Sequence, residues 1–308
     1  MRIAGVQAAP VFLDRKGTIG KVLTAMTRAA GAGADLVAFP ETYVPGYPRW
    51  VDVTHAAAWE TPEQQDAFSQ YVDAAVDVHG PEFAEVVDAA RDLNMFTYVG
   101  VAERSPSGGS VYCSLVAVDP EQGIVGVHRK LKPTHGERLV WADGDGNGLR
   151  VHDYNGWRVG GLNCWENWMP LARTAMYAQG AQLHIAAWPG SAWLTRDITR
   201  FIAREGRLYV LSVGGLLRAE HIPEDFPLRK ELLADGDNLC NGGTMIAGPD
   251  GQTIVEPVKN EETIVYADID LDLVRRERQN FDPTGHYSRP DVLQLKVDRT
   301  RRDPAEFT

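Results

Sequence analysis

The chain has 308 residues, 44% of them hydrophobic and 24% charged, and a formal net charge of −11. This length allows a large buried core, while the acidic balance argues against nucleic acid or an anionic membrane as partner, because both require a basic surface. The three cysteines, Cys113, Cys164 and Cys240, indicate neither a disulfide framework nor a paired-cysteine zinc site. A small-molecule partner and a reducing cytoplasm are expected, since the sequence has neither a recognisable signal peptide nor an apolar run of membrane-spanning length.

Short runs rich in valine, isoleucine and leucine predict strands in the first half of the chain. These strands lie at residues 2–7, 36–39, 96–103, 111–119 and 124–130. Apolar periodicity and prolines in the first turn predict helices between them, at residues 19–26, 61–79 and 81–94. The turn at 120–123, Pro-Glu-Gln-Gly, joins two strands so closely that they must be antiparallel neighbours.

The second half begins with a hairpin signal, Asn155-Gly156, between strands predicted at 149–154 and 157–163. Further elements are predicted downstream: helices at 170–180 and 196–207, strands at 182–187 and 208–213, and a hairpin of 244–247 with 253–257. Such a mixture of strands and helices predicts an α/β fold with two packed sheets and helices outside. Residues 1–295 are predicted as one domain, followed by a charged, flexible tail at 296–308.

Cys164 stands where the strand at 157–163 runs through a loop toward a helix start at Pro170. Such a turn exposes a side chain, and a thiol becomes a nucleophile when a base, a cation or helix-start amides lower its pKa. A buried structural cysteine is the alternative on the local sequence alone. Cys113 and Cys240 lack this setting and are expected to be structural.

Three charged residues also follow strand ends. Glu41 lies among prolines and aromatic residues, surroundings that raise a carboxyl pKa and suit a general base. Lys130 ends another strand, and Glu137 follows it shortly, next to Arg138. On the local sequence alone, Glu41 is equally compatible with an exposed loop acid. Lys130 alone is more typical of a solvated lysine, and Glu137 is compatible with a surface ion pair to Arg138. Their shared place at strand ends favours an active site, because α/β sheets assemble their sites at that edge.

The run Asp-Gly-Asp-Gly-Asn-Gly at 143–148 imitates the start of a calcium-binding EF-hand loop. The twelfth position of such a loop should be a glutamate, but here it is Tyr154 in a predicted strand. Histidines and cysteines form no cluster that suggests another metal site, so no metal is expected.

The segments around Glu41, Lys130 and Cys164 resemble the three motifs of the nitrilase superfamily of carbon–nitrogen hydrolases, in the same chain order. The resemblance extends from Arg2 to about Val292. Three segments are similar to the nitrilase branch in particular, at residues 130–138, 164–167 and 286–292. Amidase branches more often have aspartate where this chain has Glu166.

The resemblance implies a four-layer α-β-β-α sandwich that uses no metal or organic cofactor. It implies that Glu41 accepts the proton of Cys164, whose thiolate adds to a nitrile carbon, while Lys130 stabilises the nitrogen. A thioimidate and then a thioester would lead to a carboxylic acid and ammonia. Glu137 resembles the family's second glutamate, which holds the lysine, and is therefore a fourth catalytic candidate. A Cys–His mechanism with His135 as base is the disfavoured rival.

Further candidates are expected to contact the substrate: Tyr47, Trp50, Thr134, Trp165, Trp188, Pro189 and Trp193. The backbone N–H of Trp165 is expected to serve as an oxyanion donor, while core packing is the alternative for any one aromatic residue. Amide or carbamoyl hydrolysis, cyanide processing and non-catalytic metabolite binding remain alternatives for the function. A homo-oligomer, either a dimer or a longer spiral, is expected by resemblance.

Overall fold

Two six-stranded mixed sheets form the centre of the computed structural model, which describes residues 1–234 and 236–302. The first sheet has the order β14 (Thr263–Asp268), β1 (Arg2–Gln7), β2 (Leu36–Ala38), β3 (Phe96–Arg104), β4 (Val111–Asp119) and β5 (Gly123–Arg129). The second has the order β13 (Thr253–Val255), β12 (Met245–Ala247), β9 (Tyr209–Gly214), β8 (Leu183–Trp188), β7 (Trp157–Asn163) and β6 (Val151–Tyr154). A small antiparallel sheet pairs β10 (Leu216–Arg218) with β11 (Asn238–Asn241).

Helices cover the sheets and connect their strands. The α-helices are α1 (Arg15–Gly31), α2 (Trp50–Val53), α3 (Pro62–Ala74), α4 (Pro81–Asp92), α5 (Pro170–Tyr177), α6 (Ala192–Gly206), α7 (Arg229–Leu232) and α8 (Leu271–Asn280). Short 3₁₀ helices are η1 (His135–Leu139), η2 (Gly146–Gly148), η3 (Cys164–Trp168) and η4 (Ala219–His221). Among the helices of the described residues, none is both long enough and apolar enough to cross a bilayer.

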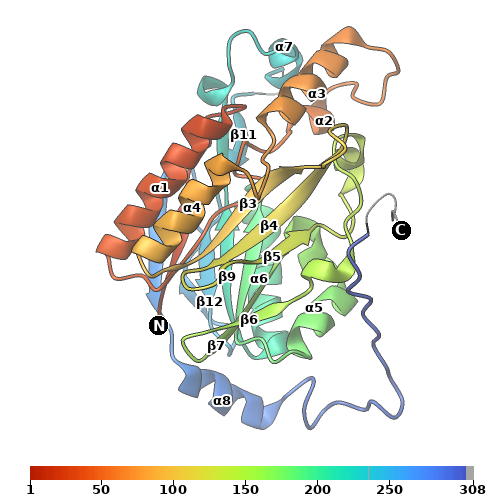
Figure 1. Ribbon diagram of the computed structural model, residues 1–308. Helices are drawn as coiled ribbons and strands as arrows, with labels where there is room; N and C mark the ends of the chain where they lie inside the picture. The colour runs from red at the N-terminus through yellow and green to blue at the C-terminus, as the bar shows by residue number, and fades with distance from the viewer. Residues whose placement is uncertain (235, 303–308) are drawn as a thin grey trace.

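The layers follow from the two-residue period of the strands. Ile3 of β1 packs between the two sheets, while its neighbour Ala4 packs against the outer helices, because successive side chains point to opposite faces. Helices α1 and α4 lie side by side on the outer face of the first sheet (Figure 1), and α5 and α6 cover the outer face of the second. The predicted four-layer α-β-β-α sandwich is confirmed.

All three predicted hairpins are present, since β4 pairs antiparallel with β5, β6 with β7, and β12 with β13. The prediction for α3 is wrong at its end, because the helix stops at Ala74 rather than near residue 79. There the N–H of Val76 donates to Ala102 O at 2.7 Å, and Val76 O accepts from Arg104 N at 2.7 Å. Pairing with the edge of β3 thus replaces the last helical turn.

Part of the segment predicted as a tail contacts the body of the protein. The Arg301 guanidinium donates to Val127 O at 2.8 Å and pairs with Asp145 at 3.2 Å, and the N–H of Arg302 donates to Asp145 Oδ2 at 3.0 Å. These contacts tie the described end of the chain to the loop that follows β5. Residues 303–308 of the predicted tail lie outside the described residues.

Candidate active site

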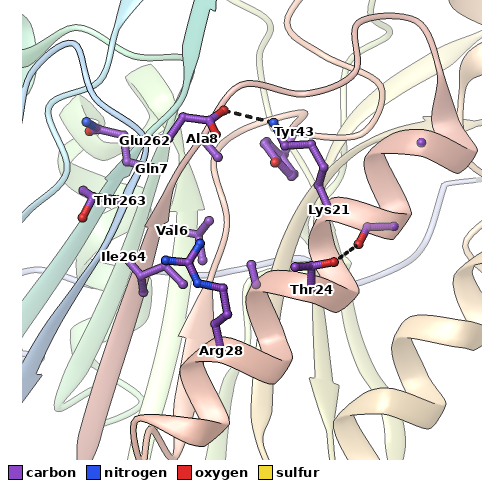
Figure 2. A pocket seen from close by; sticks show the side chains of 13 residues that line it. Val6, Gln7, Ala8, Lys21, Thr24, Arg28, Tyr43, Glu262, Thr263 and Ile264 are labelled. Carbon is purple, nitrogen blue, oxygen red and sulfur yellow. Dashed lines mark hydrogen bonds and ion pairs between the residues drawn. The ribbon is translucent and has the colours of Figure 1, made fainter.

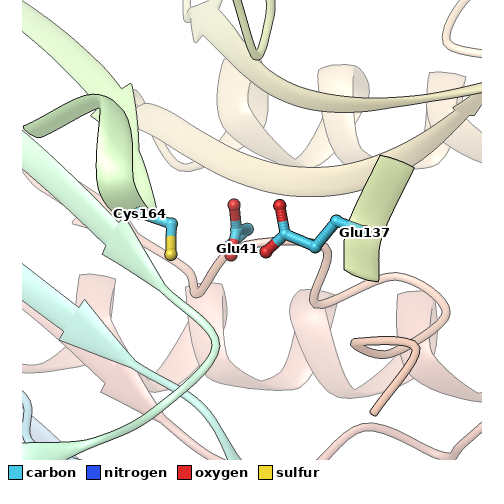
Figure 3. Close-up of side chains that lie close together, drawn as sticks. All are labelled: Glu41, Glu137 and Cys164. Atoms are coloured by element: carbon cyan, nitrogen blue, oxygen red, sulfur yellow. The ribbon is translucent and has the colours of Figure 1, made fainter. Parts of the chain in front are cut away.

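The sandwich brings together the ends of three strands, each followed by a candidate catalytic residue. Glu41 follows β2, Lys130 follows β5 directly, and Cys164 follows β7 directly. Carboxylate oxygens of Glu41 and Glu137 and the Sγ of Cys164 all lie within 4.8 Å of one another (Figure 3). Residues from three separate segments of the chain therefore form one cluster.

Glu41 is held by a close crossing of two backbones. A Cβ at Gly100 of β3 would lie 2.0 Å from Pro40 O, so only glycine lets the segment at 40–42 cross the strand at this distance. The N–H of Glu41 donates to Trp188 O of the other sheet at 3.3 Å. The carboxylate is thereby fixed at the junction of the two sheets.

Cys164 begins η3 with φ +46°, in the left-handed region that residues other than glycine seldom adopt. The Nδ2 of Asn167 donates to Leu162 O at 3.3 Å and to Cys164 O at 2.9 Å, and so secures this turn from within. Only 3% of Cys164 is exposed, although it lines a cavity. Local strain held by its surroundings is typical of a functional position.

Glu166 joins the segments that carry Lys130 and Cys164. Its buried carboxylate accepts from Leu131 N at 2.7 Å and from Asn163 N at 3.0 Å, and it contacts His128 Nε2 at 3.0 Å. Burial alone would raise the pKa of Glu166, but His128 and the two backbone N–H groups outweigh it and lower that pKa. Glu166 therefore fixes the end of β5 relative to the end of β7.

Lys130 forms the centre of the cluster. Its Nζ lies 2.8 Å from Glu41 Oε1 and 2.7 Å from Glu137 Oε2, and all three side chains are buried. Glu137 is held in turn by Thr134 N at 2.6 Å and by the Tyr47 hydroxyl at 3.1 Å. An ammonium has three donors, so one N–H remains available for a substrate.

Glu41, Glu137 and Cys164 are also residue types that can bind a metal ion. The ammonium of Lys130 already lies between the two carboxylates and pairs with both. The cluster therefore fits a lysine-bridged pair of carboxylates better than a metal site.

The ionisation of the cluster leaves the proton on Cys164 and gives Glu41 a pKa that suits a general base. Burial raises the pKa of Glu41 to about 7, against the opposing effect of Lys130. Burial and the Glu41 carboxylate hold the pKa of the Cys164 thiol well above its usual value, although Lys130 and a hydrogen bond from the Trp165 backbone act in the opposite direction. The thiol is therefore protonated at rest, beside a base poised near neutrality.

The cavity at Cys164 has a volume of about 360 Å³. Four of the residues predicted to contact the substrate line it: Tyr47, Thr134, Trp165 and Pro189. His135 and Glu137 also lie on its wall. The cavity is large enough for a small organic molecule whose reactive group reaches Cys164.

The other three predicted contacts do not line this cavity. Trp50 is 1% exposed and packs edge-on against Tyr71 and Phe226 in a separate aromatic core. Trp188 is buried beneath the site, where its carbonyl accepts from Glu41 N. Trp193 is 84% exposed on α6 and points into solvent. Aromatic composition alone did not distinguish core, pocket and surface tryptophans.

A comparison with known protein families matches residues 2–279 to the carbon-nitrogen hydrolases. The chain belongs to the carbon–nitrogen hydrolase family.

Similar carbon–nitrogen hydrolases include several nitrilases. A nitrilase from Bradyrhizobium diazoefficiens is 40% identical over 300 residues, which cover 96% of this chain and 92% of that protein. An aliphatic nitrilase from Rhodococcus rhodochrous is 36% identical and covers 98% of this chain and 84% of its own length. The solved structure of a carbon-nitrogen hydrolase from Helicobacter pylori shares the fold, with a TM-score of 0.74 at 20% identity over 94% of this chain and 96% of that one.

Several residues of this hydrolase's site were not predicted from the sequence. Arg49 and Asp52, which pair at 2.7 Å, line the cavity together with Asn241 and Cys240. Cys113, expected to be structural, places its Sγ 3.2 Å from Glu41 Oε1. The position of Arg49 two residues after Tyr47 was a usable signal. Cys113 gave none, because its contact depends on the register between β4 and its neighbours.

A second cavity of about 280 Å³ lies away from Cys164, between α1 and the edge formed by β1 and β14 (Figure 2). Lys21 reaches across it to Ala9 O at 2.5 Å and to Glu262 at 3.0 Å. The Tyr43 hydroxyl also donates to Ala9 O, at 3.3 Å. Its buried polar groups thus bind one another.

Proposed function

We propose that this hydrolase converts an organic nitrile into a carboxylic acid and ammonia, with Cys164 as the nucleophile. The observation that carries the proposal is the buried bridge of Lys130 between Glu41 and Glu137 beside the Cys164 thiol. The nitrilases similar to this chain over nearly its whole length support a nitrile as substrate. We also propose that residues 1–295 act as one catalytic domain, in a reducing compartment such as the cytoplasm, because a nucleophilic thiol must stay reduced.

In the first half of the reaction, Glu41 takes the proton of Cys164 as the sulfur adds to the nitrile carbon. The C≡N bond loses one π bond, and its nitrogen receives the proton that Glu41 took from Cys164, which gives a thioimidate and restores the Glu41 carboxylate. The free N–H of Lys130 stabilises the charge that develops on this nitrogen. Glu137 keeps Lys130 charged and in place through the 2.7 Å ion pair.

In the second half, Glu41 deprotonates a water molecule that adds to the thioimidate carbon. Loss of ammonia leaves a thioester, and a second water releases the carboxylic acid and restores the thiol. The oxyanion of each tetrahedral intermediate is stabilised by Lys130 and the backbone N–H of Trp165. One such donor is typically worth about 3 kcal/mol of transition-state stabilisation.

The proposal is tested by ammonia and acid release from aromatic, arylaliphatic and aliphatic nitriles, each paired with the matching amide. We expect at least one nitrile to yield equal amounts of acid and ammonia, and the Cys164→Ala variant to yield neither. Turnover of the amides alone would show that the enzyme is an amidase. Nitrile turnover by Cys164→Ala would refute the mechanism.

We further propose that two copies of the chain associate through the outer face of η3, α5 and α6. Large apolar side chains are exposed together there: Trp168, Met169, Leu171, Trp193, Leu194 and Phe201. Apolar surface gathered on adjoining elements is typical of a contact between proteins. The partner proposed is a second copy, because these elements also carry Trp165 and Leu194 of the cavity wall, so one contact would cover the mouth of each site.

A further inference from the structure

Cys113 contacts two members of the catalytic cluster from the middle of the first sheet. It lies on β4 and is 1% exposed. Its Sγ lies 3.2 Å from Glu41 Oε1, and its carbonyl accepts the backbone N–H of Lys130 at 2.7 Å. Burial raises the pKa of the Cys113 thiol well above its usual value, so the sulfur carries a proton that it can donate.

The two oxygens of Glu41 have different surroundings. Oε1 accepts from Lys130 Nζ at 2.8 Å and from Cys113 Sγ. Oε2 is buried and has no hydrogen-bond partner among the described residues. A buried carboxylate oxygen without a donor is costly unless the site supplies one during function. The proton of Cys164 is the one that the proposed reaction delivers.

We propose that Cys113 is a positioning residue for Glu41. By donating to Oε1 together with Lys130, it holds the carboxylate in the rotamer that keeps Oε2 free to take the proton of Cys164. This inference rests on the proposed role of Glu41 as general base. Cys113 does not line the cavity, so its effect reaches the substrate only through Glu41.

A thiol suits this position because it is a weak donor. A strong donor to the charged carboxylate would lower the pKa of Glu41 and make it a poorer base, whereas no donor would raise that pKa and leave the rotamer unfixed. The titratable groups that face Glu41 include Lys130 from the end of β5, Glu137 from η1, Cys113 from β4 and Cys164 from η3. Tyr47, Tyr71 and Cys240 also interact electrostatically with Glu41. Substitution of Cys113 changes only one of these seven.

The test is the pH dependence of kcat and KM for the wild-type enzyme, Cys113→Ser and Cys113→Ala. Serine keeps a donor and strengthens it, while alanine removes it. We expect the acid limb of the kcat/KM profile to move to lower pH in Cys113→Ser and to higher pH in Cys113→Ala. A shift of one pH unit in Cys113→Ala would mean a roughly tenfold loss at pH 6, largely recovered at pH 8.5. KM should stay within about twofold in both variants.

A second readout follows Cys164 without turnover. The rate at which iodoacetamide alkylates Cys164 is measured against pH from the mass of the Cys164 peptide. Its acid limb should lie at the lowest pH in Cys113→Ser, at a higher pH in the wild type and at the highest pH in Cys113→Ala. Val116→Ala on the same strand is the matched control, because Val116 is fully buried but packs toward the outer helices. We expect it to lower thermal stability and to leave the acid limb in place.

An acid limb at the same pH in the wild type, Cys113→Ser and Cys113→Ala would overturn the proposal. A Cys113→Ser variant whose acid limb shifts like that of Cys113→Ala would also overturn it. If Cys113→Ala does not fold, the comparison of Cys113→Ser with the wild type decides, since an unshifted limb contradicts the proposal. The Glu41→Gln variant distinguishes a failure of the proposed base from a failure of the proposed positioning role. An active Glu41→Gln would refute the proposed base, whereas an inactive one with unshifted Cys113 variants would refute only the positioning role.

Discussion

Lys130 is the residue on which the cluster depends. Two buried carboxylates as close as Glu41 and Glu137 would repel each other, and the ammonium between them removes this cost. Burial alone would lower the pKa of Lys130, but Cys164, Glu41 and Glu137 outweigh it and keep the ammonium charged. Lys130 therefore stabilises the folded protein as well as any transition state.

Lys130→Met should lose activity and also lose stability in a pH-dependent way. Without the ammonium, the folded-state pKa of Glu41, which burial already raises to about 7, rises further above its unfolded value. The contribution of Glu41 to the free energy of unfolding then falls as the pH rises through the folded-state pKa. We expect a destabilisation of about 3 kcal/mol at pH 8 and a smaller one at pH 5.5, measured by urea unfolding. An equal loss at both pH values would contradict this account.

At the scale of the elements, strand ends could be predicted from the sequence because apolar runs, Asn155-Gly156 and Pro170 mark them. Glu41, Lys130 and Cys164 lie at such ends, so the core of the candidate site could be found without coordinates. Residues that contact the site from within an element, away from its end, could not be predicted in this way. Cys113 lies within β4. Whether Trp50, Trp188 and Trp193 lie in the core, in the cavity wall or on the surface depends on how their elements pack. The end of α3 depended likewise on pairing with β3.

Glu166→Gln should weaken the link between β5 and β7. An amide has one acceptor oxygen, so its NH₂ group would face either Leu131 N–H or Asn163 N–H, a donor against a donor. We expect a loss of about 2 kcal/mol in the free energy of unfolding, together with a lower kcat, because Lys130 and Cys164 lose their fixed spacing. Urea unfolding and steady-state kinetics measure the two effects. Glu121→Gln at an exposed turn is the control, and a Glu166→Gln enzyme as stable and active as this control would refute the role.

Arg49 gives the cavity wall at α2 a hydrogen-bonding character. Its Nη1 pairs with Asp52, and its Nε is buried without a partner among the described residues. Arg49→Leu should therefore lower kcat/KM more for nitriles with a hydrogen-bonding substituent than for their unsubstituted counterparts. Arg49→Lys keeps the charge but not the planar guanidinium, and should give an intermediate ratio. An identical loss for both kinds of nitrile would show that Arg49 does not select the substrate.

At the scale of the whole molecule, the layers could be predicted from the periodicity of the strands, but the last strand and helix of the chain, β14 and α8, could not. Strand β14 pairs with β1 at the edge of the first sheet, where Val6 lies opposite Ile264, 258 positions later in the sequence, and α8 follows β14. Neither was predicted, because no short-range signal couples the two ends of a chain. The exposed face of η3, α5 and α6 is likewise a property of the folded molecule.

Leu171→Glu and Trp193→Glu should dissociate the proposed assembly. Each places a charge in the apolar face, where burial of an unpaired carboxylate opposes association. Sedimentation velocity should show a smaller species for both variants and the wild-type species for Trp59→Glu, which alters an exposed tryptophan in the turn between α2 and α3. A wild-type enzyme that sediments as a monomer would contradict the proposed contact.

The covalent bond between Cys164 and the substrate carbon is the centre of this account. Acid quenching during turnover of a nitrile, followed by mass spectrometry of the Cys164 peptide, tests it most directly. We predict an adduct with the full mass of the nitrile, the thioimidate, or with that of its acyl group, the thioester, and no adduct on Cys113 or Cys240. Nitrile turnover with Cys164 unmodified at every quench time, and with undiminished activity in Cys164→Ala, would contradict the account.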